Sequence, residues 1–408
     1  MVATVLHDDD SLPAQWRASA PVMMAVGAVC ILLSLGLCYM AGTTEQRESG
    51  FRTFMHSYLT NYIYCLTFCI GGLFFVLVTN LARAGWCATI RRVAEILAAT
   101  VAWWAALFVP ILAMVLLTDS DALYAWNAPD VALSKEKLYY LNGNWFAIRA
   151  IIYFAIWVLA SSYYFAKSRE QDETGSAEIS LRLQRVAGPA IALFALSLNF
   201  AAFDWVMSID PTWFSTIFGV YLFAASNMAF FAFMIAVFTF LQTQGRVQKY
   251  VTVEHFHDMS KFLFGFVFFW TYIAFSQFML YWYGNIPEET IWFKHRMEGG
   301  WQYVGLLLIL GHFALPMLLL LSRHVRRNRT VMCGWAIFLM FMHWIDMSFL
   351  VMPNIGAPVS VMMWVSHAVC AVGMISVFLS LLVMRVGDTP LIAKRDPWVP
   401  DALSYHVM

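Results

Sequence analysis

Ten apolar segments, each about as long as a membrane-spanning helix, constrain this chain more than any other feature. A bilayer core of about 30 Å is crossed by roughly 20 apolar residues in helical conformation. Each segment is a continuous run rich in Leu, Phe, Ala and Val, without the alternation of a membrane-spanning strand. The sequence therefore predicts an all-α integral membrane protein with ten transmembrane helices. The segments are residues 18–40, 57–80, 95–117, 145–166, 186–208, 214–241, 260–284, 301–321, 333–352 and 361–384.

Composition excludes a soluble protein and a separate soluble domain. Of the 408 residues, 61% are hydrophobic and 12% are charged, whereas soluble domains have about 45–50% and about 25%. The 25 basic and 25 acidic residues balance, so no overall field favours nucleic acid. We expect a tail at 1–17, a transmembrane domain at 18–384 and a tail at 385–408. No loop is long enough for a redox or nucleotide module, which would have to belong to a partner chain.

The distribution of basic residues predicts the orientation. The two tails and the loops after the second, fourth, sixth and eighth segments carry 17 Lys and Arg, whereas the other loops carry 6. Because loops rich in Lys and Arg stay in the cytoplasm, both termini are predicted to be cytoplasmic. The acidic stretch at residues 8–10 has the wrong charge for a signal peptide, so we expect the first helix to be retained.

The seven cysteines form none of the common cofactor motifs. There is no CxxC, no CxxCH for covalent haem, and no Cys/His spacing typical of zinc or iron–sulfur sites. The sequence therefore predicts a chain without a metal site or a bound cofactor of its own.

Five charged residues lie within the predicted spans and are the first candidates for function. Charged side chains at membrane depth are costly and usually face a partner or a polar cavity. Arg149, Asp204 and Asp346 fall in the outer halves of their helices. Glu95 and Lys261 lie near cytoplasmic helix ends, where a side chain can also extend into water.

Two roles remain open for the deeper acids. Asp204 and Asp346 could each form a buried ion pair with Arg149, or carry protons. The two roles are compatible, and the sequence favours neither.

Three intramembrane histidines extend this set. His343 and Asp346 are spaced i,i+3 and share a helix face, so they could form an acid–imidazole relay. Pro316 cannot donate a hydrogen bond to the carbonyl of His312, which predicts a break in the eighth helix. His312, His343 and His367 lie at comparable depths. They could also bind haem b, although nothing fixes a ligand pair.

A faint repeat relates the fifth and ninth helices. Residues 203–211 contain an acid followed by Met-Ser and Pro, and residues 343–353 show the same order. The two helices are four spans apart and run in the same direction. This predicts two four-helix bundles, helices 2–5 and 6–9, as parallel repeats.

Three stretches then carry a family resemblance: residues 200–219 (FAAFDWVMSIDPTWFSTIFG), 261–265 (KFLFG) and 272–289 (YIAFSQFMLYWYGNIPEE). With the ten-helix layout, they resemble one of the two homologous membrane subunits of alternative complex III, a bacterial quinol oxidoreductase. The subunit in question is often described as quinone-binding too, but its proposed role is proton translocation, and the other membrane subunit is the better-supported site of quinol oxidation. It belongs to the NrfD-like family of polysulfide-reductase membrane subunits. The resemblance covers essentially the whole chain.

The resemblance implies two four-helix bundles flanked by helices 1 and 10, one on each side, in the bacterial inner membrane. It implies as partners a homologous quinol-binding membrane subunit, an iron–sulfur subunit, multihaem and monohaem cytochrome c subunits, and in some complexes a terminal oxidase. Quinol, haem c and iron–sulfur clusters would then belong to the complex and its partners, and this chain would contact lipids. The role that the resemblance implies for this chain is proton translocation through polar residues between its helices.

We therefore expect a cofactor-free subunit that couples quinol oxidation elsewhere in the complex to proton movement. Asp204, His343 and Asp346 would carry protons and Arg149 would balance charge. Glu95 and Lys261 would form the cytoplasmic entrance, and His312 and His367 are further candidates. Three alternatives stay open: a direct quinol-oxidising subunit with quinone near the outer ends of one bundle, a secondary transporter, and a structural scaffold.

Overall fold

The computed structural model describes residues 10–41, 47–118, 120–129, 131–357 and 359–405. Within these ranges the chain contains helices and no strand, and ten helical spans are long and apolar enough to cross a membrane. The ten predicted transmembrane helices are thus confirmed, and most extend past the predicted apolar runs by several residues. The first nine residues of the predicted N-terminal tail and residues 406–408 of the C-terminal tail lie outside the described ranges.

The second to fifth spans form one four-helix bundle. Each span contacts the next in the chain, and the fifth returns to the second and closes the ring. The third span is broken into three short helices, and Pro110, which lacks a backbone N–H, opens the last of them. These elements are α2 (Arg47–Leu81), α3 (Ala88–Ala99), α4 (Val101–Leu107), α5 (Val109–Leu117), α7 (Gly143–Thr174) and α8 (Ala177–Trp205), with the 3₁₀ turn η2 (Gly85–Cys87) before α3.

The sixth to ninth spans form the second bundle in the same cyclic order. Its members are α9 (Phe218–Thr243), α10 (Val253–Gly284), the eighth span made of α12 (Trp301–Leu307), η5 (Leu308–Ala314) and α13 (Leu315–Leu319), and α15 (Arg329–Val351). Between them lie the short helices α11 (Pro287–His295) and α14 (Arg323–Arg327). The two closed rings agree with the bundles expected from the repeat.

The two bundles join through α2 and α9, the most buried spans of the molecule. A Cβ atom added at Gly71 of α2 would lie 2.5 Å from the carbonyl oxygen of Ser226 on α9. Only glycine permits so close an approach of two helices, as is common in membrane proteins. The centre of the protein is therefore the seam between the bundles.

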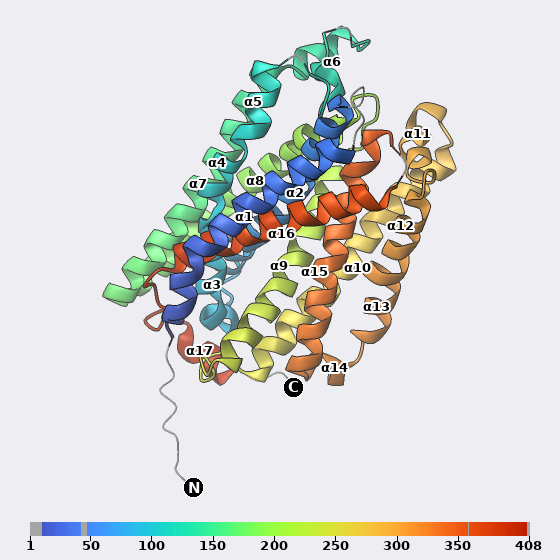
Figure 1. Cartoon of the computed structure of the whole chain (residues 1–408). Coiled ribbons are helices and arrows are strands. Elements are labelled where there is room, and N and C mark those ends of the chain that lie inside the picture. The colour runs from blue at the N-terminus through green and yellow to red at the C-terminus, as the bar shows by residue number, and fades with distance from the viewer. Residues whose placement is uncertain (1–9, 42–46, 119, 130, 358, 406–408) are drawn as a thin grey trace.

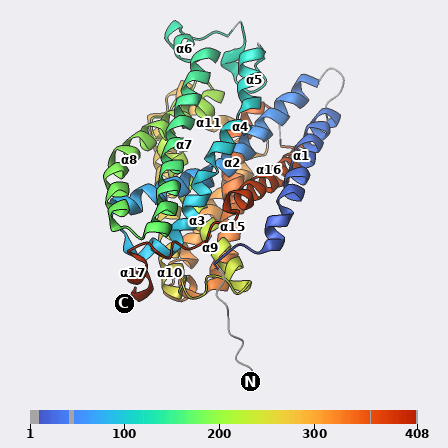
Figure 2. The ribbon, with the colours of Figure 1, turned by 90° about the vertical axis from the view of Figure 1, so that its left-hand side faces the viewer.

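The first and last spans, α1 (Ala14–Ala41) and α16 (Val361–Val386), pack against each other rather than on opposite sides of the bundles. Figures 1 and 2 show them side by side, crossing the bundles diagonally. Gly27 and Gly373 meet at the crossing, where an added Cβ on Gly27 would lie 2.8 Å from the carbonyl oxygen of Gly373. Ser34 also donates a hydrogen bond to the carbonyl of Ser366 at 2.8 Å. Small residues and interhelical hydrogen bonds of this kind hold helices together in lipid.

The eighth span contains the predicted break. Residues Leu308–Ala314 form a π-helical turn around His312, directly before Pro316. Such wide turns are rare and occur often at functional sites.

Both described chain ends lie at the same end of the bundles (Figure 1), which we call the terminal face. It also carries α14 and the short helix α17 (Val399–Ser404). The opposite end, which we call the far face, carries α6 (Lys135–Tyr140) and α11. The even number of spans requires this arrangement.

Candidate functional site

Asp204 forms the polar centre of the first bundle. It lies on α8 with none of its surface exposed. Arg149 on α7 binds both carboxylate oxygens, with Nε 2.7 Å from Oδ2 and Nη2 3.1 Å from Oδ1. The Tyr153 hydroxyl donates to Oδ2 at 2.7 Å. Arg149 also lies 3.9 Å above the ring of Tyr140. The charge of Asp204 is thus balanced by a bidentate partner, as one of the two sequence hypotheses expected.

Asp346 occupies the corresponding place on α15 but has a different environment. It too is fully buried. Its oxygens accept hydrogen bonds from the Tyr221 hydroxyl of α9 and from the Trp270 indole of α10, the latter at 3.1 Å. No Lys, Arg or His nitrogen of the described residues lies within ion-pair distance of Asp346. The pairing with Arg149, one of the two roles left open for this acid, is therefore not formed here.

This difference decides which acid can exchange a proton at lower cost. A proton added to Asp204 would leave the Arg149 guanidinium without its anion. A proton added to Asp346 would remove an otherwise uncompensated buried charge, and the neutral donors around it can stay in place. The two related acids thus differ in their surroundings: Asp204 has a cationic partner, whereas Asp346 has neutral donors among the described residues.

His343 shares a helix with Asp346, but no hydrogen bond joins them in the described structure. The Nε2 atom of His343 lies 2.8 Å from the hydroxyl of Thr67 on α2. Its Nδ1 atom is buried and has no partner among the described groups. His343 and Asp346 therefore bond to different partners, and the predicted direct relay between them is not formed.

His312 reaches the Asp346 site through an aromatic contact. Its ring lies edge to face with that of Trp270, with the centroids 4.0 Å apart. Both ring nitrogens of His312 are buried, and neither has a hydrogen-bond partner within the described ranges. Trp270 therefore touches both the acid and the histidine, and the ring nitrogens of His312 retain unused hydrogen-bonding capacity.

His367 belongs to a separate network at the seam of the bundles. Its Nε2 atom lies 2.9 Å from the hydroxyl of Ser348, and its ring stacks on that of Trp344 at 4.9 Å. The Trp344 indole donates to Asn61 at 2.8 Å. These contacts hold the ring in place and join α2, α15 and α16.

Two mid-span amides add buried polar atoms to the second bundle. Asn227 of α9 bonds its amide nitrogen to the Phe223 carbonyl, but its Oδ1 has no partner among the described residues. The Nε2 of Gln277 on α10 is likewise buried and unpartnered in the described structure. Buried polar groups are almost always satisfied by protein or by ordered water. Asn227, Gln277, His312 and His343 therefore predict bound water within this bundle.

Sequence reasoning missed Arg296, which lies in the connection before α12. It is 1% exposed, and it donates hydrogen bonds to the carbonyls of Trp292, Phe349 and Leu350. Burial lowers the pKa of Arg296 below its ordinary value, and the nearby Asp210 and Tyr221 partly oppose this. The second bundle thus has a buried cation near the far face, Arg296, which forms no ion pair with Asp346 in the described structure.

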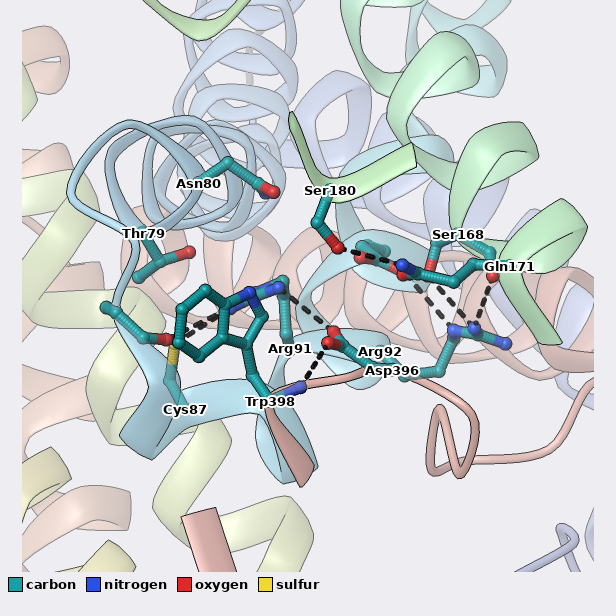
Figure 3. Close-up of polar contacts among 12 residues, drawn as sticks. Thr79, Asn80, Cys87, Arg91, Arg92, Ser168, Gln171, Ser180, Asp396 and Trp398 are labelled. Carbon is teal, nitrogen blue, oxygen red and sulfur yellow. Dashed lines mark hydrogen bonds and ion pairs between the residues drawn. The ribbon is translucent and has the colours of Figure 1, made fainter. Parts of the chain in front are cut away.

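Glu95 lies in a charged cluster near the terminal face, part of which Figure 3 shows. Arg92 contacts Glu95 at 3.1 Å, Asp172 at 2.6 Å and the Ser168 hydroxyl at 2.9 Å. The predicted entrance residue is thus charge-balanced and only 4% exposed. Lys261 is not part of this cluster: it pairs with Asp258 at 2.9 Å on α10, and its side chain is 39% exposed.

The C-terminal segment covers this cluster. Asp396 pairs with Arg91 at 3.2 Å and accepts the backbone N–H of Trp398 at 3.0 Å (Figure 3). Beside them is a cavity of about 50 Å³, lined in part by Asn80 and Ser180. A polar cavity of this size can hold water.

The chain matches no protein-family model and no curated protein.

Proposed function

We propose that this chain is a proton-handling membrane subunit of a respiratory quinol oxidoreductase. The observation that carries the proposal is Asp346, a buried acid held by neutral donors and joined through Trp270 to His312. The class of complex rests on the resemblance to the proton-translocating membrane subunit of alternative complex III. The partners would be a homologous quinol-binding subunit, an iron–sulfur subunit, cytochrome c subunits and, in some complexes, a terminal oxidase.

In this proposal the second bundle carries protons between water-filled ends. Asp346 takes up and releases a proton, and the Tyr221 hydroxyl holds its carboxylate in position. His312 and His343 would bind, at ring nitrogens that have no partner in the described structure, the water through which the proton moves. Lys261, near the terminal-face end of α10, would mark the entrance to this bundle, and the terminal face would be the cytoplasmic face of a bacterial inner membrane. Quinol would be oxidised on a partner subunit, and this chain would bind no redox cofactor.

The first bundle then has a structural task. The Arg149–Asp204 pair is bidentate and further bonded by Tyr153. Protonation of this carboxylate would leave the Arg149 guanidinium buried without its anion, so Asp204 is the poorer candidate for a carrier. Asp204 would therefore fix the far-face end of α7 and α8.

The experiment compares Asp346→Asn and Asp204→Asn complexes in liposomes. Quinol turnover and proton release per electron are measured separately. We expect D346N to retain turnover and lose proton yield, because an amide cannot carry the proton. Asp121→Asn, an exposed far-face change, controls for the loss of a carboxylate. Full proton yield in D346N would refute the proposal, and purification of the chain without haem-bearing partners would refute the class of complex.

A further inference from the structure

A large apolar cavity lies where α1 and α16 pass over the bundles. Its volume is about 810 Å³, and its walls come from α1, α2, α3, α9, α15 and α16. This falls in the range of ligand sites, about 300–1,000 Å³. Nearly all of its lining side chains are aliphatic or aromatic. Water needs polar partners in a buried site, so the cavity fits hydrocarbon.

The cavity opens sideways between α15 and α16. Phe341 on α15 and Val372 on α16 line it and are 50% and 54% exposed. Cys65 and Phe378 on its inner wall are buried. A lipid chain could therefore enter from the bilayer and lie against the core.

The cavity spans about one leaflet on the side of the terminal face. Along α9 its lining runs from Phe233 to Leu241, two residues before the helix ends. Eight residues of helix rise about 12 Å, close to half of a bilayer core of about 30 Å. Leu12 and Leu391 close the end of the cavity next to the terminal face.

Basic residues surround that end. Arg17 follows the lining residue Trp16 and pairs with Asp388. Arg329 donates to the Gln242 side chain beside Leu241 at 2.5 Å. Two further cations approach from the chain ends. Arg246 donates to the Ser11 carbonyl, next to Leu12, at 2.5 Å, and Lys394 pairs with Asp10 at 3.1 Å. Four basic and two acidic side chains thus lie around this end of the cavity, a net positive set within reach of a headgroup in the adjoining leaflet.

We propose that this cavity binds an acyl chain of an anionic phospholipid from the leaflet at the terminal face, with the headgroup beside Arg246 and Arg329. Basic pockets between helices at this depth recognise anionic headgroups. A quinone ring would need free hydrogen-bond donors inside the cavity. Of the donors in the lining, Ser19 donates to the Trp16 carbonyl and Trp344 donates to Asn61, which leaves the Tyr64 hydroxyl and the Trp16 indole in a wall that is otherwise almost entirely aliphatic and aromatic. The basic rim and apolar interior thus match a phospholipid.

The first test fills the cavity in the full-length protein. Ala236 on α9 and Ala371 on α16 line it and are nearly buried. Native mass spectrometry after mild detergent extraction should show phosphatidylglycerol on the wild type and its loss from A236F/A371F. Ala195→Phe, at an exposed position of α8, should retain the lipid. Equal retention by A236F/A371F and A195F, or a neutral lipid or quinone retained on the wild type in preference to phosphatidylglycerol, would overturn the proposal.

The second test removes the headgroup contacts. Each of Arg246→Gln and Arg329→Gln should weaken phosphatidylglycerol retention about fivefold, which corresponds to about 1 kcal/mol per basic residue. Retention of phosphatidylcholine should not change. If the cavity-filling variant does not fold, wild-type protein exchanged into brominated phosphatidylglycerol is imaged by electron cryomicroscopy. Bromine density must lie between α9 and α16, and density elsewhere only would contradict the proposal.

Discussion

Arg149 and Asp204 join α7 to α8 through two hydrogen bonds of 2.7 and 3.1 Å, at a carboxylate with no exposed surface. Asp346, the acid at the related position of α15, receives only neutral donors. Both halves of the repeat thus contain a buried acid, but only the acid of the first half has a basic partner. Mutations at the two sites should therefore have different effects on stability.

Replacing Arg149 by Ala should destabilise the protein by about 3–5 kcal/mol, because it leaves a buried carboxylate unpaired. The free energy of unfolding in mixed detergent micelles measures this. R149A/D204N, which removes both charges, should recover a large part of the loss. A double variant as unstable as R149A would show that packing around Arg149, rather than its charge, matters.

Asp346→Asn should change the free energy of unfolding by about 1 kcal/mol or less, because the amide oxygen can still accept a hydrogen bond from Trp270 or Tyr221. Asp204→Asn should cost about 3–5 kcal/mol, because it strands Arg149. The same unfolding assay compares the two. Equal losses would mean that the environments of the two acids do not differ as their contacts indicate.

Replacing Tyr221 by Phe should lower stability by about 1.5–3 kcal/mol if Asp346 is ionised, because a hydrogen bond to a charged group is lost. The proposal for proton transfer further expects a lower proton yield with less effect on turnover. Tyr281→Phe, at the far-face end of α10, is the matched control, since its hydroxyl donates to the Phe214 carbonyl. A proton-yield loss of the same size in Y281F would remove the argument for Tyr221.

Ordered water should lie within hydrogen-bonding distance of His312 and of the Asn227 side-chain oxygen. Both carry buried atoms without partners in the described structure, and such atoms are normally satisfied. An experimental map at a resolution that shows water tests this directly. His312→Phe should displace this water, whereas His367→Phe should not, because His367 already bonds to Ser348.

Asp396→Ala should release the C-terminal segment. The Arg91–Asp396 pair is buried on both sides, at 7% and 5% side-chain exposure, so its loss should cost about 3–5 kcal/mol. Amide hydrogen exchange should increase in Val399–Ser404 and much less in α9. Asp401→Asn, at an exposed position of the same segment, should leave exchange unchanged.

The sequence predicted the spans well because burial in lipid requires long apolar runs. It also predicted the Arg149–Asp204 pair as one of two options, because Arg149 is the one basic residue in the outer half of any span. The partners of Asp346 could not be found in this way. Tyr221 and Trp270 are two of 17 Tyr and 17 Trp residues, and only the packing of α9 and α10 on α15 selects them.

Arg296 was missed for a different reason. It lies between two predicted spans, so a search by membrane depth passed over it, although the fold buries it against Trp292. The pairing of α1 with α16 also depends on tertiary structure. Gly27 and Gly373 are two of 22 glycines, and nothing local marks them as facing each other.

The contact between Gly27 and Gly373 can form only after both α1 and α16 are in the membrane. α1 leaves the ribosome first, and the helix that covers its glycine face leaves last. Until α16 is inserted, α2 is the main protein neighbour of α1, and the face of α1 that packs on α16 is exposed to lipid. A nascent chain that stops before Val361 would therefore lack the helix against which most of α1 packs.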